Sequence, residues 1–219
     1  MRPLRSLGLA AAAMLAAASV SAAETVADRV FGAEPFADVP APSHLRYRYE
    51  MRGQGIDPPF ASSIALEVRE ADGEGSREVF VDMFEGVNRR AFGPIAAREQ
   101  NPLVLVFLQR DVTQMANLTG GAPEYFRQQL RRAFNEPAES EAIEIALGGR
   151  TLPARRLVMT PFADDPRIDR FPQFRDKTYE FVVAEDVPGG IYRVGSRTPD
   201  PRDGHLILEE TVTFESAGP

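Results

Sequence analysis

The sequence of 219 residues contains no cysteine, one lysine (Lys177) and two histidines (His44 and His205). A chain without cysteine forms no disulfide, offers no thiol nucleophile and has no cysteine to which a lipid can be attached. The two histidines have no spaced acidic ligands beside them, and they can meet only if the first and last strands are neighbours. We therefore predict no metal and no cofactor, and interpret both histidines as solvated residues at strand ends.

Catalytic motifs are also missing from the sequence. It has no Gly-x-Ser-x-Gly elbow, no His-Glu-x-x-His pair, no phosphate-binding loop and no dinucleotide fingerprint. Aspartates at residues 164–169 and 200–203 lack the regular oxygen spacing and closing glutamate of a calcium loop. Acidic residues are numerous, so a carboxylate pair for glycoside hydrolysis remains open, although no two residues are singled out. No residue is assigned a catalytic role, and a hydrolase of unknown type ranks third among our functional hypotheses.

Basic residues are also fewer than acidic residues. The chain has 25 lysines and arginines against 32 aspartates and glutamates, and two of those arginines, Arg2 and Arg5, lie within residues 1–23. Without that segment the balance is 23 basic against 32 acidic residues, a net charge of −9. Binding to nucleic acid depends on neutralising phosphates, so this balance excludes nucleic acid as an expected partner and disfavours anionic membrane surfaces.

Residues 1–23 have the order of a secretory signal peptide: two arginines, an apolar run at residues 7–18, then small residues up to Ala22 and Ala23. The run is shorter than the roughly 20 apolar residues of a membrane span, although an N-terminal anchor helix is the alternative. We expect cleavage after Ala22 or Ala23. Because the chain is rich in arginine, poor in lysine and free of cysteine, we expect export to a bacterial periplasm as a soluble protein with no stable membrane span.

Most of the remaining chain alternates apolar and polar residues with a period of two, which is typical of half-buried strands. We predict strands at residues 45–52, 64–69, 78–85, 87–92, 143–147, 152–160, 179–183, 191–196 and 206–215, separated by short turns rich in Gly, Pro and Asp. This series indicates an antiparallel meander, after which the chain frays. Residues 24–42 are predicted to be a lead-in segment with a short helix near residues 26–31 and a linker, followed by a single domain at residues 43–216.

A helical insert at residues 101–137 interrupts the strands. Asn101 is a capping residue, Pro102 suits the first helical position, and Gly120-Gly121 ends the first helix. A second helix is predicted from Pro123 to Asn135. The apolar block at residues 103–108 is also compatible with a buried strand, and this alternative stays open.

The combination predicts an α+β fold, mostly antiparallel: a curved sheet or half-barrel covered by the two-helix insert. If the helices leave space above the sheet, the cavity is a site for a hydrophobic ligand; if they fill it, the same side chains form a dry core. The candidate ligand-binding residues are the inward set, Leu45, Tyr47, Tyr49, Met51, Ile64, Leu66, Val68, Val79, Val81, Met83, Leu105 and Leu108.

A second candidate site is a group of arginines on the second helix, Arg127, Arg131 and Arg132. Such a group can bind an anionic partner by charge-assisted hydrogen bonds. The competing interpretation is an ordinary solvated helix face.

The order of elements from Ser43 to Phe214, after a cleaved signal, resembles the periplasmic lipoprotein-carrier (LolA/LolB-like) superfamily. The resemblance implies an incomplete barrel plugged by helices, and a non-enzymatic carrier or sensor that shields acyl chains or another hydrophobic ligand. No residue of that family is matched here. Our leading hypothesis is a periplasmic protein that binds a hydrophobic ligand or a lipidated partner, and the alternative is an envelope interaction or assembly protein with a filled core.

Overall fold

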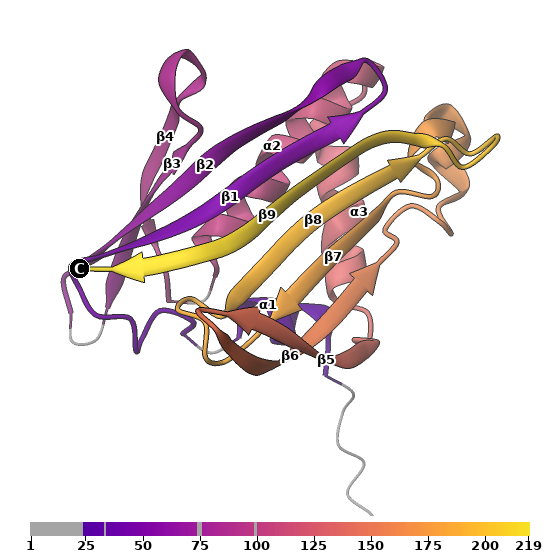
Figure 1. Cartoon of the computed structure of the whole chain (residues 1–219). Coiled ribbons are helices and arrows are strands. Elements are labelled where there is room, and N and C mark those ends of the chain that lie inside the picture. Colours follow the sequence, from indigo (N-terminus) through magenta and orange to yellow (C-terminus); the bar gives the residue numbers. More distant parts are fainter. Residues whose placement is uncertain (1–23, 33, 74–75, 99) are drawn as a thin grey trace, which may run out of the picture.

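The computed structural model describes residues 24–32, 34–73, 76–98 and 100–219. The predicted signal peptide, residues 1–23, lies outside the described residues. The described chain forms one sheet of nine antiparallel strands, with helices on its concave face (Figure 1). The strands are β1 (Ser43–Gly53), β2 (Ile56–Glu70), β3 (Arg77–Met83), β4 (Arg90–Ala96), β5 (Ser140–Leu147), β6 (Arg150–Met159), β7 (Thr178–Val183), β8 (Ile191–Pro199) and β9 (Leu206–Gly218).

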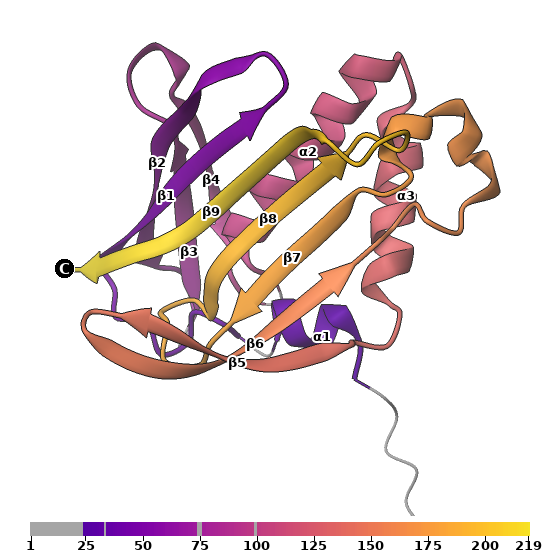
Figure 2. The ribbon, with the colours of Figure 1, turned by 45° about the vertical axis from the view of Figure 1, so that its right-hand side comes forward.

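The strand order is β4-β3-β2-β1-β9-β8-β7-β6-β5, so the first and last strands of the chain are neighbours at the centre of the sheet. Strands β4 and β5 are its two edges, and they are not paired with each other in the described part of the chain. The sheet curves around the helices without closing, as Figure 2 shows. The predicted α+β half-barrel with a helical cover is therefore confirmed.

Three helices are present in the described residues: α1 (Val26–Phe31), α2 (Pro102–Thr119) and α3 (Pro123–Phe134). The Asn101 side chain accepts hydrogen bonds from the backbone N–H groups of Leu103 and Val104, at 3.1 and 3.4 Å, which caps α2. Gly120, with φ 64°, ends this helix in the left-handed conformation. The apolar block at residues 103–108 is therefore helical rather than a strand. No helix in the described residues is long and apolar enough to cross a membrane.

Helices and sheet share one hydrophobic core on the concave side. The inward residues of the strands are buried against α2 and α3, with contacts such as that between Phe134 on α3 and Phe181 on β7, whose ring centres are 5.6 Å apart. The lead-in segment contributes to the same core through Val26, Val30 and Phe36. It is tied to the rest of the fold by a hydrogen bond from Val26 N to Glu136 O, at 3.2 Å.

Strand β2 begins at Ile56, whereas the sequence pattern predicted a break up to residue 59 and a strand from residue 64. The prolines Pro58 and Pro59 led to that prediction. They are tolerated because β3 pairs with β2 only from Ile64 onward, and the register with β1 shifts at this point, so a missing N–H interrupts little of the ladder.

Two other strand boundaries also differ from prediction. The strand predicted at residues 87–92 is β4, three residues later, because Phe84 (φ 67°) and Gly86 (φ 59°) turn the chain first. Pro94 lies inside β4, which is possible on an edge strand opposite a register shift. The chain does not fray after residue 215, because β9 continues to Gly218 and pairs there with His44.

Candidate functional site

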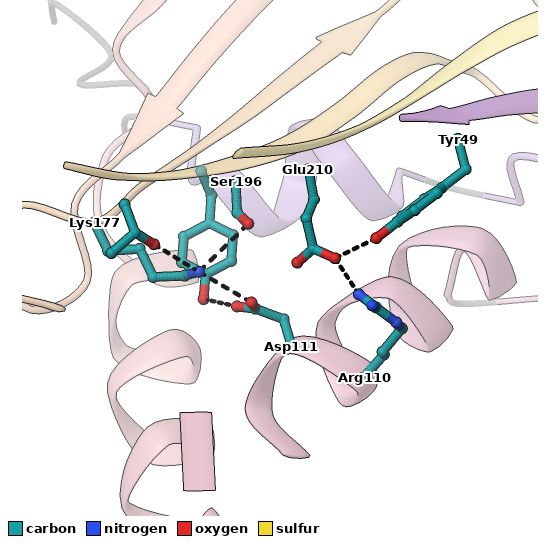
Figure 3. A network of polar contacts seen from close by, with 8 residues as sticks. Tyr49, Arg110, Asp111, Lys177, Ser196 and Glu210 are labelled. Atoms are coloured by element: carbon teal, nitrogen blue, oxygen red, sulfur yellow. Dashed lines mark hydrogen bonds and ion pairs between the residues drawn. The ribbon is translucent and has the colours of Figure 1, made fainter. Parts of the chain in front are cut away.

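A group of polar side chains lies between the middle of α2 and the concave face of the sheet (Figure 3). Two successive helix residues, Arg110 and Asp111, reach different strands. We call this group the α2 junction; it consists of Tyr49, Arg110, Asp111, Lys177, Tyr179, Ser196, Thr198 and Glu210.

Asp111 connects α2 to the start of β7. Its Oδ1 atom is 3.0 Å from Lys177 Nζ, and its Oδ2 atom accepts a hydrogen bond from the Tyr179 hydroxyl. The Lys177 ammonium also lies 3.4 Å from Ser196 Oγ and 3.3 Å from Thr198 Oγ1, both on β8. Both Asp111 carboxylate oxygens and the Lys177 ammonium are therefore hydrogen-bonded in the interior.

Glu210 on β9 is the second acid of the junction. Its Oε1 atom accepts hydrogen bonds from the Tyr49 hydroxyl on β1 and from the Arg110 guanidinium on α2. That guanidinium lies over the rings of Tyr49 and Phe84, at 5.4 and 5.5 Å from their centres. Through its two adjacent charged residues, α2 is thus attached to strands β1, β7, β8 and β9.

The junction is buried to an unusual degree for charged groups. Asp111 and Lys177 are each 1% exposed and Glu210 is 0% exposed. Two oxygens, Glu210 Oε2 and Gln114 Oε1, are buried with no hydrogen-bond partner among the described residues. Removing charges from water costs several kcal/mol per ion, and a buried polar atom without a partner costs roughly 1–3 kcal/mol more. The junction is therefore a costly way to attach α2 to the sheet.

The pKa values of the two junction tyrosines, Tyr49 and Tyr179, are strongly raised. Burial, and then the negative charge of Glu210, raises the pKa of Tyr49 well above its usual range. Burial and the charge of Asp111 act in the same way on the pKa of Tyr179. Burial alone would lower the pKa of Arg110, but its pairing with Glu210 outweighs this and raises it. Both phenols therefore stay protonated as hydrogen-bond donors to the two carboxylates.

The sequence analysis named one junction residue, Tyr49, as a candidate and missed the others. A signal was present in the strand alternation. Glu210 lies in phase with Val212 and Phe214 on the inward side of β9, and Lys177 lies in phase with Tyr179 and Phe181 ahead of β7. A charged residue at a core-facing position of a strand predicts a buried partner, because an unpaired buried charge is prohibitively unfavourable.

Ten of the predicted ligand-binding residues lie on the sheet, and nine of these are at most 1% exposed: Leu45, Tyr47, Tyr49, Ile64, Leu66, Val68, Val79, Val81 and Met83. The tenth, Met51, is partly buried, as is Leu108 on α2. Leu105 is 41% exposed, so its predicted inward orientation is wrong. In the first turns of α2 the buried positions are Leu103, Val104 and Phe107 instead, because α2 is rotated relative to the stripe predicted from its sequence. The sheet residues form a packed core beneath α2 in this structure.

The three arginines proposed as an anionic-partner patch lie on the outer side of α3. Each has an acidic neighbour: Arg127 and Arg131 reach Glu124 at 3.3 and 3.0 Å, and Arg132 reaches Glu136 at 3.8 Å. These ion pairs reduce the positive charge that the patch offers, which agrees with a solvated helix face.

The described part of the chain has pockets on other surfaces, and the three given next contain none of the twelve predicted ligand-binding residues. One, of about 580 Å³, lies between α1 and the strands β5, β6 and β7. A polar pocket of about 440 Å³ lies beside the end of α3 and residues 158–165, and one of about 250 Å³ lies on β6–β9.

The turn between β8 and β9 brings Asp200, Asp203 and His205 together. Arg202 already occupies the Asp200 carboxylate, with nitrogens at 3.0 and 2.6 Å from its two oxygens, so we assign no metal here. The two histidines lie at opposite ends of the paired strands, since His44 pairs with Gly218 whereas His205 precedes β9.

No protein-family model matches this sequence, and no curated protein matches it. Among solved structures, the fold has similarity to lipoprotein LppX of Mycobacterium tuberculosis (8% identity, TM-score 0.30), covering 78% of this chain and 84% of that one. A DUF1329 family protein from Desulfovibrio piger gives 9% identity and a TM-score of 0.27 over 88% and 89% of the two chains. A LolA superfamily protein from Nitrosomonas europaea gives 7% identity and a TM-score of 0.22 over 88% and 92%. All three TM-scores are below 0.5, so function is argued below from this chain's own residues.

Proposed function

We propose that this protein binds a hydrophobic ligand, or the lipid of a lipidated partner, between the curved sheet and its helical cover, without catalysing a reaction. In the proposed cycle the described arrangement, with α2 on the sheet, is the closed state. Helix α2 moves away from the sheet, and the apolar inner faces of β1, β2 and β3 accept the ligand in its place.

The α2 junction is the observation that carries this proposal. An apolar helix face over an apolar sheet needs no charges to stay in place, and well-packed apolar residues are often equally or more stabilising than a buried ion pair. Here the contact contains two acids, two bases and one buried carboxylate oxygen, Glu210 Oε2, that has no hydrogen-bond partner among the described residues. Such a contact fixes one docked position of α2 while lowering the free energy needed to separate it from the sheet.

The position of the junction also suits an opening motion. Arg110 and Asp111 lie near the middle of α2, whereas its first residue follows Asn101, whose Nδ2 donates to Gly189 O at 2.7 Å. The start of α2 is therefore held by a neutral, well-formed hydrogen bond, and the charged contacts come further along. We expect α2 to pivot about its N-terminal end, with the junction breaking as a unit.

Native mass spectrometry of the protein purified from its own envelope tests the proposal directly. We expect a fraction of the protein to carry an additional mass that dissociates as a lipid or an acyl chain. Extraction of that ligand should leave a folded protein that regains the mass on incubation with an envelope lipid extract. Repeated recovery of unliganded protein that takes up no lipid would contradict the proposal.

The filled core beneath α2 favours one alternative, an envelope interaction or assembly protein that uses an outer surface. Its most suitable surface is the edge strand β4 and the turn before it, where Phe92 is 39% and Val87 is 95% exposed. A stable partner that is retained by the wild-type protein and lost in a Val87→Asp, Phe92→Asp variant, with no lipid bound in either case, would favour this second function.

We further propose that the protein works in the periplasm after removal of residues 1–23. The sequence pattern supports this, together with the participation of Val26 in the core, which places the start of the folded domain close to the expected cleavage site. The intact mass of protein from the periplasmic fraction should correspond to a chain that begins at Ala23 or Glu24.

A further inference from the structure

One pocket of the described structure lies apart from the α2 junction. It has a volume of about 580 Å³, is open to solvent, and lies between α1 on one side and β5, β6 and the end of β7 on the other. Sites for small ligands have volumes of roughly 300–1,000 Å³, so this space is of sufficient size. None of its lining residues belongs to the junction, so a ligand here requires no movement of α2.

Much of the pocket wall is apolar. Val30 and Phe31 come from α1, Ile143 from β5, Ala154 from β6 and Val183 from β7. Val30 and Ala154 are buried, whereas Phe31, Ile143 and Val183 are only partly buried and present surface to the pocket. This wall suits an unbranched hydrocarbon chain, which gains contact with each of these groups as water leaves.

Among the residues that line the pocket, Arg29 has a hydrogen-bond donor without an acceptor. Its terminal nitrogen pairs with Glu24 Oε2 at 2.6 Å, which neutralises its charge locally. Its Nε atom is buried and has no hydrogen-bond partner among the described residues. A buried N–H donor without an acceptor is unfavourable. The Arg29 side chain is 28% exposed, so a rotation of this side chain can bring Nε to the pocket, where an acceptor atom of a ligand would be bound strongly for a single hydrogen bond.

The charge around the pocket limits what that acceptor can be. Two arginines and four acids line it: Arg29, Arg155, Glu24, Asp28, Glu185 and Asp186. The acids outnumber the bases, so a ligand carboxylate or phosphate would meet net repulsion in a site of reduced dielectric. An uncharged carbonyl oxygen accepts the same hydrogen bond from Nε without that repulsion.

We propose that this pocket binds a neutral single-chain acyl ester, with its hydrocarbon chain against Val30, Ile143 and Val183 and its carbonyl oxygen on Arg29 Nε. The site goes beyond the proposed function, because it lies outside the interface between α2 and the sheet and selects for an uncharged head group. Free fatty acids of the same chain length are predicted to be discriminated against.

Calorimetric titration with 1-monolauroylglycerol, and separately with laurate, both below their micellar concentrations, tests this site. We expect one monolauroylglycerol to bind per protein. Laurate should bind at least about tenfold more weakly, because its carboxylate is repelled by the acids of the pocket and lacks the favourable contact of the ester. Equal or tighter binding of laurate would overturn the assignment of a neutral head group, and saturation at many molecules per protein would indicate non-specific adsorption and overturn the site.

Three variants locate the ligand. Arg29→Met keeps the apolar stem and removes Nε, and should weaken monolauroylglycerol about tenfold. Ala142→Trp places a large side chain in the pocket from an exposed position of β5 and should abolish binding. Arg127→Met is the matched control, because Arg127 also pairs with a glutamate but lies on α3, and its affinity should be unchanged.

The outcome separates this site from the one under α2. Unchanged binding in Arg29→Met and Ala142→Trp variants that melt like the wild type would overturn the pocket as the site. If Asp111→Asn alters binding and the pocket variants do not, the ligand lies under α2 instead. If the pocket variants lose monolauroylglycerol while envelope lipid is still retained in native mass spectra, both sites exist and are independent.

Discussion

The two faces of the sheet both carry ion pairs, but in opposite surroundings. On the concave face, the Asp111 and Lys177 side chains are each 1% exposed and meet beneath α2 at 3.0 Å. On the convex face, Arg156 pairs with Glu180 at 2.6 Å, with side chains that are 42% and 28% exposed. Each pair joins a basic side chain to a carboxylate, and one difference between them is whether water can take the place of either partner.

This difference decides what each pair does. A partly exposed pair contributes about 0–1 kcal/mol, because solvent screens it and can replace it. A buried pair has given up its hydration, so breaking it by removing one partner is strongly destabilising, although replacing all of it by apolar groups is not. We therefore interpret the convex pairs as ordinary surface charge and the α2 junction as a device that sets the position of α2.

Removing one partner of the buried pair should have the largest effect. Asp111→Ala leaves Lys177 charged in the interior, and we expect a loss of about 3–5 kcal/mol in the free energy of unfolding. Chemical denaturation followed by circular dichroism measures it. A loss below about 1 kcal/mol would mean that water reaches Lys177, and would remove the distinction between the two faces.

Replacing both charges of this pair should have the opposite sign. The triple variant Asp111→Leu, Lys177→Met, Tyr179→Phe leaves neither charge of the pair behind, although the Ser196 and Thr198 hydroxyls lose Lys177 as a partner, and we expect stability equal to the wild type or higher by up to about 4 kcal/mol. The same variant should take up less lipid, because its closed state is no longer weakened by the buried Asp111–Lys177 pair. A triple variant as unstable as Asp111→Ala would show that the junction is needed for folding itself.

High pH should act on the concave face through its tyrosines. Burial raises the pKa of Tyr47, Tyr49 and Tyr179 above the ordinary value near 10, so the folded state holds these protons where the unfolded chain loses them. The stabilisation is complete below pH of about 10 and is lost as the pH rises toward the folded-state pKa. Each tyrosine adds up to about 1.4 kcal/mol per pH unit, and Tyr179→Phe should give a shallower slope in denaturation series between pH 9 and pH 11.

The smallest effect is expected on the convex face. Glu180 pairs with both Arg156 and Arg193, and its distance from Arg193 is 3.7 Å. Glu180→Ala removes this shared partner and should lower the free energy of unfolding by no more than about 1 kcal/mol. Half-molar salt should reduce that cost further, because it screens exposed charges. A loss comparable to that of Asp111→Ala would place this ion pair in a dry environment and contradict the comparison of the two faces.

The fold was predictable to the extent that local pattern decides it. The period-two alternation placed all nine strands, and the cap at Asn101 and the stop at Gly120 placed α2. Strand boundaries were predicted wrongly where tertiary context overrides a residue's usual preference. Pro58, Pro59 and Pro94 occur inside strands because they lie at register shifts, where a missing N–H interrupts no regular backbone pairing. The orientation of Leu105 was predicted wrongly for a related reason: residues 103–108 are apolar on every side of the helix, so they do not specify which side faces the sheet.

The site was less predictable than the fold. Asp111 and Lys177 are 66 positions apart and Arg110 and Glu210 are 100 apart, and only the tertiary fold brings β7, β8 and β9 beneath α2. An acid in the inward phase of β9 was a usable sign of a buried partner, but its partners could be named only from the structure. The pocket beside α1 had no such sign, because it is formed by segments whose side-by-side placement follows from the tertiary fold.

The reactivity of Lys177 tests the central claim, that α2 leaves the sheet when a hydrophobic ligand is taken up. Lys177 is the only lysine in the chain, and its Nζ lies within the junction, so an amine-specific acylating reagent reports on this one position apart from the N-terminus. The measurement is the rate of Lys177 modification, read by peptide mass spectrometry, with and without submicellar dihexanoylphosphatidylcholine. The account predicts slow modification of the free protein and a rate that rises with bound ligand. A rate that stays low at saturation with ligand would contradict it.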